Sequence, residues 1–75
     1  MPIYFFDVQI GEQTEADSIG SELVSSGSVA AMALDLCLKI AQERMPGHSD
    51  VRVSVRAAEG QPIYQADITL FGSWT

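Results

Sequence analysis

Two neighbouring segments of the chain alternate strictly between apolar and polar residues, and only a short turn separates them. From Asp50 to Ala57 every second residue is apolar, and the segment 62–71 repeats this pattern. Alternation with a period of two places all the apolar side chains of a strand on one face. Glu59-Gly60, between the two segments, suits a tight connection. The sequence therefore predicts an antiparallel hairpin with strands at 50–57 and 62–71.

The beginning of the chain shows the same period. Over residues 3–10, Tyr4 and Phe6 fall on one face together with the next two even-numbered residues, whereas Phe5 falls on the more polar face. We predict a strand at 3–10 with Tyr4 and Phe6 in the core and Phe5 outside it.

Residues 11–27 are polar and acidic and contain three glycines. A short strand at 21–25, with Leu23 facing inward, is compatible with this composition, although no periodicity marks it. The segment is otherwise expected to form turns and a solvated acidic loop.

The segment 28–45 is rich in Ala, Leu and Met and predicts the one helix of the chain. Ser28 or Ser26 can cap its N-terminus by accepting a hydrogen bond from the first turn. Pro46-Gly47 cannot continue the helix, which is therefore expected to end near Met45.

This helix is apolar around most of its circumference. At about 100° per residue, one stripe packs against the sheet and a second lies roughly opposite. The first stripe contains Val29, Met32, Ala33, Leu36 and Ile40, and the second contains Leu34, Leu38 and Met45. A helix on a single sheet needs only one apolar face, so either residues 11–27 or a partner subunit must cover the second. Leu34, Leu38 and Met45 are therefore our candidate oligomer face.

These elements give the order β(β)αββ in a single domain of 75 residues. The expected fold is α+β, an antiparallel sheet of three or four strands with one helix packed across one face. A chain this small has little stability to spare, so it must pack efficiently or associate.

The charge balance argues against nucleic acid as a partner. The net charge is −6, and the only four cations are scattered along the chain. Phosphate neutralisation needs several clustered cations, and an anionic membrane surface makes the same demand. The longest apolar run is far shorter than the roughly 20 residues that span a bilayer. The chain carries no visible signal peptide and no pair of cysteines, so we expect a cytoplasmic protein.

Nothing in the sequence predicts a catalytic, metal or cofactor site. Cys37 lies inside the helix and His48 in the loop after it, so they make a poor nucleophile and base pair and a poor zinc site. The acidic residues of the 11–27 segment lack the spacing of a calcium-binding loop. We expect no enzyme activity and no cofactor.

The outward face of the sheet offers a candidate interaction surface, formed by Phe5, Arg52, Arg56 and Asp67. Cross-strand ion pairs on a wet sheet face explain the charges simply. The less favoured interpretation is a recognition surface, in which the arginines and one aromatic ring meet a partner. Both interpretations stay open at this stage.

Several motifs together resemble a family of short bacterial proteins of unknown function. They are PIYFFDV at the start, DSIGSEL from Asp17 to Leu23, the alanine-rich helix, and VRVSVRAAEGQPIYQADITL, which covers the hairpin. The chain departs from the family where Ala58-Glu59-Gly60 replaces a usually Asp-rich tip. The resemblance implies a single domain with no established activity. It also implies one structural unit formed by Asp17, Gly20, Glu22 and Leu23.

We therefore predict a non-enzymatic protein-interaction or assembly module, self-associated as a homodimer or a larger oligomer, with another protein as a further partner. One alternative is a small-ligand carrier, in which Phe5, Tyr64 and Trp74 line a subunit cleft that takes a flat aromatic molecule. The other alternative is an antitoxin-like inhibitor of a basic partner protein.

Overall fold

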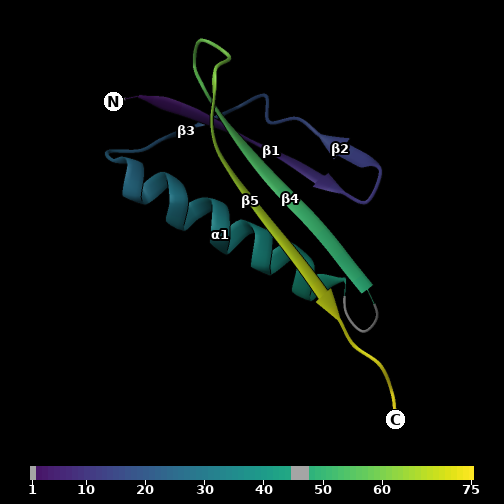
Figure 1. Cartoon of the computed structure of the whole chain (residues 1–75). Helices are drawn as coiled ribbons and strands as arrows, with labels where there is room; N and C mark the ends of the chain where they lie inside the picture. The colour runs from purple at the N-terminus through teal and green to yellow at the C-terminus, as the bar shows by residue number, and fades with distance from the viewer. Residues whose placement is uncertain (1, 45–47) are drawn as a thin grey trace.

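The computed structural model describes residues 2–44 and 48–75 and consists of one helix on one antiparallel sheet (Figure 1). The elements in chain order are β1 (Ile3–Ile10), β2 (Gln13–Glu15), β3 (Ser21–Glu22), α1 (Ser26–Glu43), β4 (His48–Ala57) and β5 (Pro62–Phe71). The predicted α+β class and the order of its elements are confirmed.

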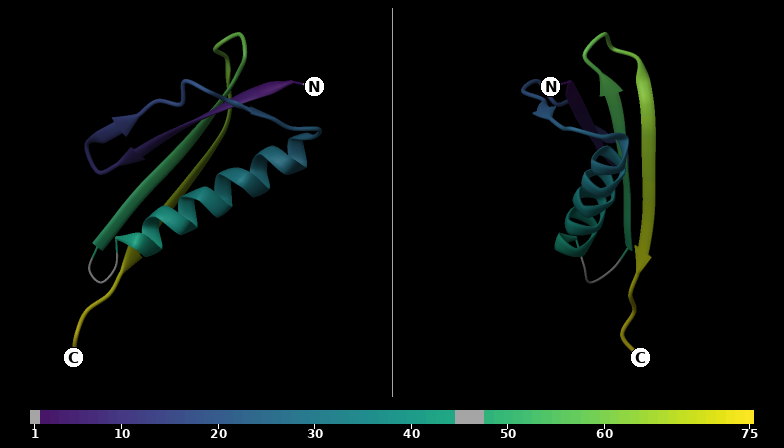
Figure 2. Two further views of the ribbon diagram at one scale, coloured as in Figure 1. Left: turned by 180° about the vertical axis from the view of Figure 1, so that it is seen from behind. Right: turned by 90° about the vertical axis from the view of Figure 1, so that its left-hand side faces the viewer.

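The sheet has the order β2-β1-β4-β5, and β3 also pairs with β1, beside β2. The predicted hairpin is present, with Val53 opposite Ala66, and β1 pairs with β4, with Phe6 opposite Val55. The helix covers one face of this sheet and packs mainly on β4 and β5. Seen from behind, it lies in front of the hairpin and leaves β1 and β2 to one side (Figure 2, left).

The strand count and one strand boundary differ from the prediction. The sheet has five strands rather than three or four, because β2 forms at Gln13–Glu15, and the strand expected at 21–25 shrinks to Ser21–Glu22. The three residues of β2 are all exposed, so they carry no hydrophobic alternation for a sequence pattern to detect. Backbone pairing with β1 alone makes this segment a strand.

The helix begins and ends two residues earlier than predicted. Its N-cap is Ser25 rather than Ser26 or Ser28, since Ser25 has an extended backbone and its side chain accepts a hydrogen bond from the N–H of Ser28. The last helical residue is Glu43, followed by Arg44 as the C-cap. Met45 lies outside the described residues, as does the side chain of His48. The following strand, β4, begins at His48 rather than Asp50, because it continues to pair with the end of β5.

The alternation in the strands places the core as predicted. Phe6 is buried, Tyr4 is half-buried and packs against the core, and Phe5 lies on the other face. The buried apolar side chains of the hairpin are three valines and one alanine, namely Val51, Val53, Val55 and Ala66.

The buried stripe of the helix differs from the one predicted. It consists of Val29, Ala33, Cys37 and Ala41, while Met32 is largely exposed. Small residues spaced four apart let a helix approach the sheet closely, so they occupy the line of contact, and the larger Leu36 and Ile40 pack at its flank. The hydrophobic pattern indicated an apolar helix, but residue size decided which stripe faces the sheet.

In the part of the chain that the structure describes, the second apolar stripe stays partly exposed. Leu34 and Leu38 are 48% and 43% exposed. Residues 13–15 and 21–22 pair with β1, and the loop between them lines a groove with Met32 and Leu36, on the opposite flank of the helix. Residues 11–27 therefore do not cover Leu34 and Leu38.

We predict unequal roles for the adjacent rings of Phe5 and Phe6. Phe6→Ala should lower the free energy of unfolding by about 3–5 kcal/mol, as expected when a buried Phe is removed from a core. Phe5→Ala removes a half-buried ring on the other face and should cost clearly less. Denaturant melts of both variants beside the wild type measure the difference, and equal losses would contradict the assignment of faces.

Candidate functional site

The outer face of the sheet, on the side away from α1, collects the four residues of the candidate interaction surface. Phe5 comes from β1, Arg52 and Arg56 from β4, and Asp67 from β5. The register places Arg52 directly opposite Asp67 and Arg56 directly opposite Phe5. The four residues thus form two adjacent pairs.

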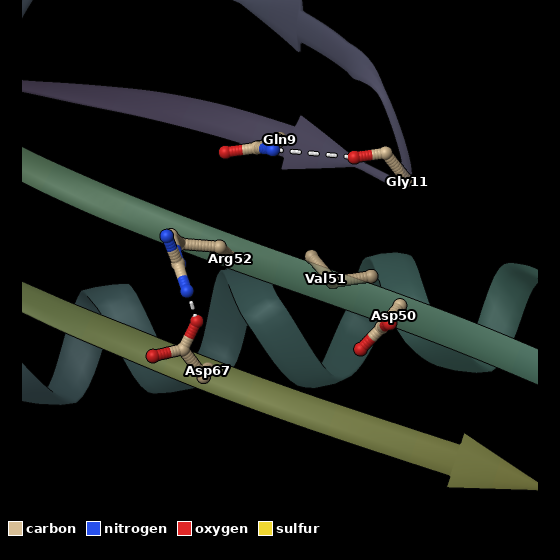
Figure 3. A pocket seen from close by; sticks show the side chains of 6 residues that line it. All are labelled: Gln9, Gly11, Asp50, Val51, Arg52 and Asp67. Atoms are coloured by element: carbon tan, nitrogen blue, oxygen red, sulfur yellow. Dashed lines mark hydrogen bonds and ion pairs between the residues drawn. The ribbon is translucent and has the colours of Figure 1, made fainter.

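The first pair is a cross-strand ion pair. Arg52 Nε donates to Asp67 Oδ1 at 2.6 Å (Figure 3). Asp67 Oδ2 also accepts a hydrogen bond from the Gln65 amide at 3.1 Å. The hydrogen bond from Arg52 lowers the pKa of the Asp67 carboxyl. Both side chains are about half exposed, so the pair adds little stability. It does neutralise both charges.

A shallow depression of about 150 Å³ lies beside this ion pair. Its lining includes Gln9, Asp50, Arg52 and Asp67, and Figure 3 shows these side chains on the outer face with α1 behind the sheet. Drug-sized ligands occupy pockets of about 300–1,000 Å³. The depression is therefore too small to bury such a ligand.

The second pair belongs to a larger cluster centred on Arg56. The Arg56 guanidinium lies over the Phe5 ring, with its carbon 4.7 Å from the ring centroid, which is a favourable cation–π distance. It also donates to both oxygens of Asp7, from Nε at 2.8 Å and from Nη2 at 3.3 Å. This bidentate bond is the main cause of the lowered pKa of Asp7. Phe5, which the sequence assigned to the candidate interaction surface, thus packs under an arginine.

The same cluster holds the loop between β2 and β3. Between the two strand pairings, residues 5–7 of β1 lie opposite residues 16–20, so two extra residues bulge out of the ladder. Arg56 Nη2 donates to the backbone oxygen of Asp17 at 2.9 Å, and the Asp17 N–H donates to Asp7 Oδ1 at 2.9 Å. The backbone N–H and the backbone oxygen of Asp17 are therefore both hydrogen-bonded to side chains of the outer face.

The Asp17 side chain replaces a backbone partner in the sheet. Its Oδ2 accepts the N–H of Phe6 at 3.1 Å, at the point of β1 where the bulge interrupts the ladder. Its Oδ1 accepts the N–H groups of Ile19 and Gly20, at 3.0 and 3.1 Å. Three backbone donors thus converge on one carboxylate, and they lower its pKa, Gly20 most strongly.

Gly20 closes this loop in a conformation that other residues adopt only with strain. Its φ is +83°, and a Cβ at this position would lie 2.7 Å from Cγ2 of Ile3 and 3.0 Å from Cε1 of Phe5. Phe5 is therefore packed between Gly20 and Arg56. The sequence resemblance implied that Asp17, Gly20, Glu22 and Leu23 act together, and these contacts explain how Asp17 and Gly20 do so. Asp7 and Arg56, which complete the cluster, were not assigned to it, because they join it only through sheet pairing.

A groove runs along the inner face of the sheet, between α1 and the β1–β2 edge. Its floor includes Phe6 and Val8, its wall Met32 and Leu36, and its volume is about 420 Å³. An adjoining hollow of about 400 Å³ continues past Ile10 to Arg44. The groove is apolar at its base, and its lining also includes Glu15 and Asp17, with Arg44 in the adjoining hollow.

The thiol of Cys37 faces the core. Its Sγ lies 3.4 Å from the backbone oxygen of Val51, and burial raises the pKa of the thiol, so it stays protonated. Among residues 2–44 and 48–75, no group of three or more His, Cys, Asp or Glu side chains is placed to hold a metal ion.

We predict that Asp17→Asn destabilises the protein by about 1–3 kcal/mol, since one carboxylate oxygen becomes an N–H₂ group that faces the Phe6 N–H donor.

The lowered pKa values of Asp7 and Asp17 add stability that is present above about pH 4 and is lost as the pH falls through their folded-state values. Thermal melts between pH 7 and pH 3 should show a shallower acid dependence for Asp17→Asn. Glu59→Gln, an equal charge change in an exposed turn, should match the wild type.

We also predict that Gly20→Ala costs more than Gly60→Ala. Both glycines have a positive φ, +83° and +94°, so each alanine should cost about 1–2 kcal/mol through backbone strain. Only at Gly20 does the new methyl group meet other atoms, which should add about 1–3 kcal/mol. Equal shifts in the urea midpoint for the two variants would contradict this, because they would show that Ile3 and Phe5 move away from the new methyl group without loss of stability.

Comparison with known proteins identifies a family and no function. No curated protein and no solved structure matches the chain. No helix in the described part of the chain is long and apolar enough to cross a membrane. One family, described as a domain of unknown function, DUF6894, matches residues 3–69, from the start of β1 almost to the end of β5. The match takes in the Asp17 loop together with the two strands that hold it, and the chain belongs to the DUF6894 family.

Proposed function

We propose that the chain is a non-enzymatic interaction module that assembles with a second copy of itself. The observation that carries this proposal is the exposure of Leu34 and Leu38 on the flank of the helix opposite the groove. Two leucines that are 48% and 43% exposed on adjacent turns form an apolar strip, and such strips on small proteins mark interaction sites.

The position of this strip supports a partner that approaches beside β5. Met32 and Leu36 face β1 across the groove. Leu34 and Leu38 lie two positions from Leu36, which corresponds to about 160° around a helix, so they are on the opposite flank. Since the sheet order is β2-β1-β4-β5, the flank turned away from β1 lies toward β5.

The absence of enzyme activity is part of the proposal. Its support is chemical: the only thiol is buried and protonated, and the carboxylates with lowered pKa values are engaged by arginines or by backbone donors. Groups that are committed to structural bonds and hold their charge are poor general acids and bases near neutral pH. We further propose a cytoplasmic location, where a single buried thiol is at no risk of mispairing.

The two alternative functions have less support. Phe5 and Tyr64 project from opposite faces of the sheet, so they do not line one cleft within a chain. Trp74 is 90% exposed in the C-terminal tail. An inhibitor of a basic partner is favoured by the net charge of −6 alone.

We predict that the wild type sediments as a dimer or larger at micromolar concentration and that Leu38→Glu weakens this assembly by about tenfold or more, as expected at an apolar hot spot. Leu38 is partly exposed, so circular dichroism should stay native. Gln13→Glu makes the same charge change on the exposed strand β2 and should leave the assembly intact. A monomeric wild type would refute the proposed function.

A further inference from the structure

The two edges of the sheet are built differently. One edge consists of the short strands β2 and β3, and the Asp17 loop between them occupies the middle of β1. The other edge is β5, a strand of ten residues that pairs with β4 on one side. Short, interrupted edges resist pairing with another chain, whereas long regular edges invite it.

The edge of β5 lacks the features that usually protect such a strand. Its inward side chains are all apolar, its only proline is the first residue, and its only charge, Asp67, is already paired with Arg52. Leu34 and Leu38 lie above it on the helix. An edge of this kind, with an apolar strip beside it, can pair with a strand of another chain.

The backbone hydrogen bonds identify the residues of β5 that face the open edge. The Gly11 N–H donates to the backbone oxygen of Asp50, so the even-numbered residues of β4 direct their backbone groups toward β1. The Ala57 N–H donates to the backbone oxygen of Gln61, so the odd-numbered residues of β4 direct theirs toward β5. Because the pattern alternates, Ala66 and Ile68 of β5 bond to β4. The backbone groups of Gln65, Asp67 and Thr69 therefore point to the open edge.

We propose that two copies of this chain pair antiparallel along β5, about a two-fold axis beside Ala66, and so form one continuous sheet. This arrangement rests on the proposed self-assembly and specifies its geometry. A two-fold axis perpendicular to the sheet keeps both helices on the same face, where Leu34 and Leu38 of the two subunits approach each other.

Charge complementarity selects the register. The middle of Pro62–Phe71 lies between Ala66 and Asp67, so an axis at either residue uses nearly the whole strand. An axis at Asp67 would set two carboxylates directly opposite each other, which is destabilising. An axis at Ala66 instead places Asp67 opposite the Gln65 amide of the second copy, which can donate a hydrogen bond to it.

The available area is sufficient for a specific dimer. Ten residues at about 3.3 Å each give an edge roughly 33 Å long. The chain measures 49 × 23 × 16 Å. Even with the smallest of these dimensions as its depth, the edge face offers roughly 500 Å² per subunit, or about 1,000 Å² in total, which is the lower limit for a stable interface.

Disulfide trapping tests the arrangement directly. In the proposed register Gln65 of one copy and Asp67 of the other form a directly opposed pair, at a Cα separation of about 5.5 Å that a disulfide can bridge. The double variant Gln65→Cys/Asp67→Cys should form a covalent dimer on mild oxidation, with circular dichroism unchanged. Neither single variant should do so, and the wild type controls for the buried Cys37. Trapping by Asp67→Cys alone would overturn the register.

A proline variant tests the edge without new thiols. Gln65→Pro removes a backbone donor that points to the open edge, which an edge strand tolerates, and should weaken dimerisation roughly tenfold or more through the two bonds lost across the axis. Gln65→Ala keeps this donor and should dimerise nearly as the wild type does. If the wild type is a dimer, but the double cysteine variant forms no disulfide-linked dimer and Gln65→Pro does not weaken dimerisation, the β5 pairing is overturned and the proposed assembly function stands. A monomeric wild type would overturn both.

Discussion

The close contact between α1 and the β4–β5 hairpin is the constraint on which the rest of this structure depends. Ala33, Cys37 and Ala41 bring the helix close to the valines of β4, and they are small enough to do so without displacing the strands. The helix consequently lies over the hairpin and not over the middle of the sheet. A helix placed off centre leaves a groove on the β1 side and an uncovered flank on the β5 side.

The side chains of the outer face are engaged mainly with one another. Arg52 and Asp67 neutralise each other across the hairpin, and Arg56 bonds to Asp7, the Asp17 backbone and the Phe5 ring. A guanidinium with this many partners stabilises a loop more readily than it recognises a free carboxylate. The outer face is therefore organised to hold the Asp17 loop against β1, and this loop blocks one edge of the sheet.

The contrast between the two edges connects structure to assembly. One edge is short, interrupted and held by an aspartate that takes the place of a backbone acceptor. The opposite edge is long, regular and flanked by exposed leucines. A chain of 75 residues buries a small core, so pairing at the open edge would add apolar burial that the single subunit lacks. Pairing there also leaves the Asp17 loop undisturbed.

The sequence by itself determined the element types, the faces of the strands and the unusual second apolar stripe of the helix. Alternation in 3–10, 50–57 and 62–71 was sufficient for this, because the period of a strand is fixed by its backbone geometry. The strand β2 could not be predicted in this way, because its three residues are exposed and polar and only pairing with β1 orders them. The buried stripe of α1 was predicted only in part, since a pattern of apolar residues does not reveal that small side chains such as Cys37 and Ala41 make the closest contact.

Only the tertiary structure decided what Phe5, Asp7 and Arg56 do. They are separated by up to about fifty positions in the chain and meet because β1 pairs with β4 in one particular register. The same fold places residues 11–27 on the β1 side, so they do not cover Leu34 and Leu38. The sequence alone had left open whether this segment or a partner subunit covers the two leucines. Local patterns record which face of an element is apolar, whereas the contact that covers that face depends on how distant segments pair.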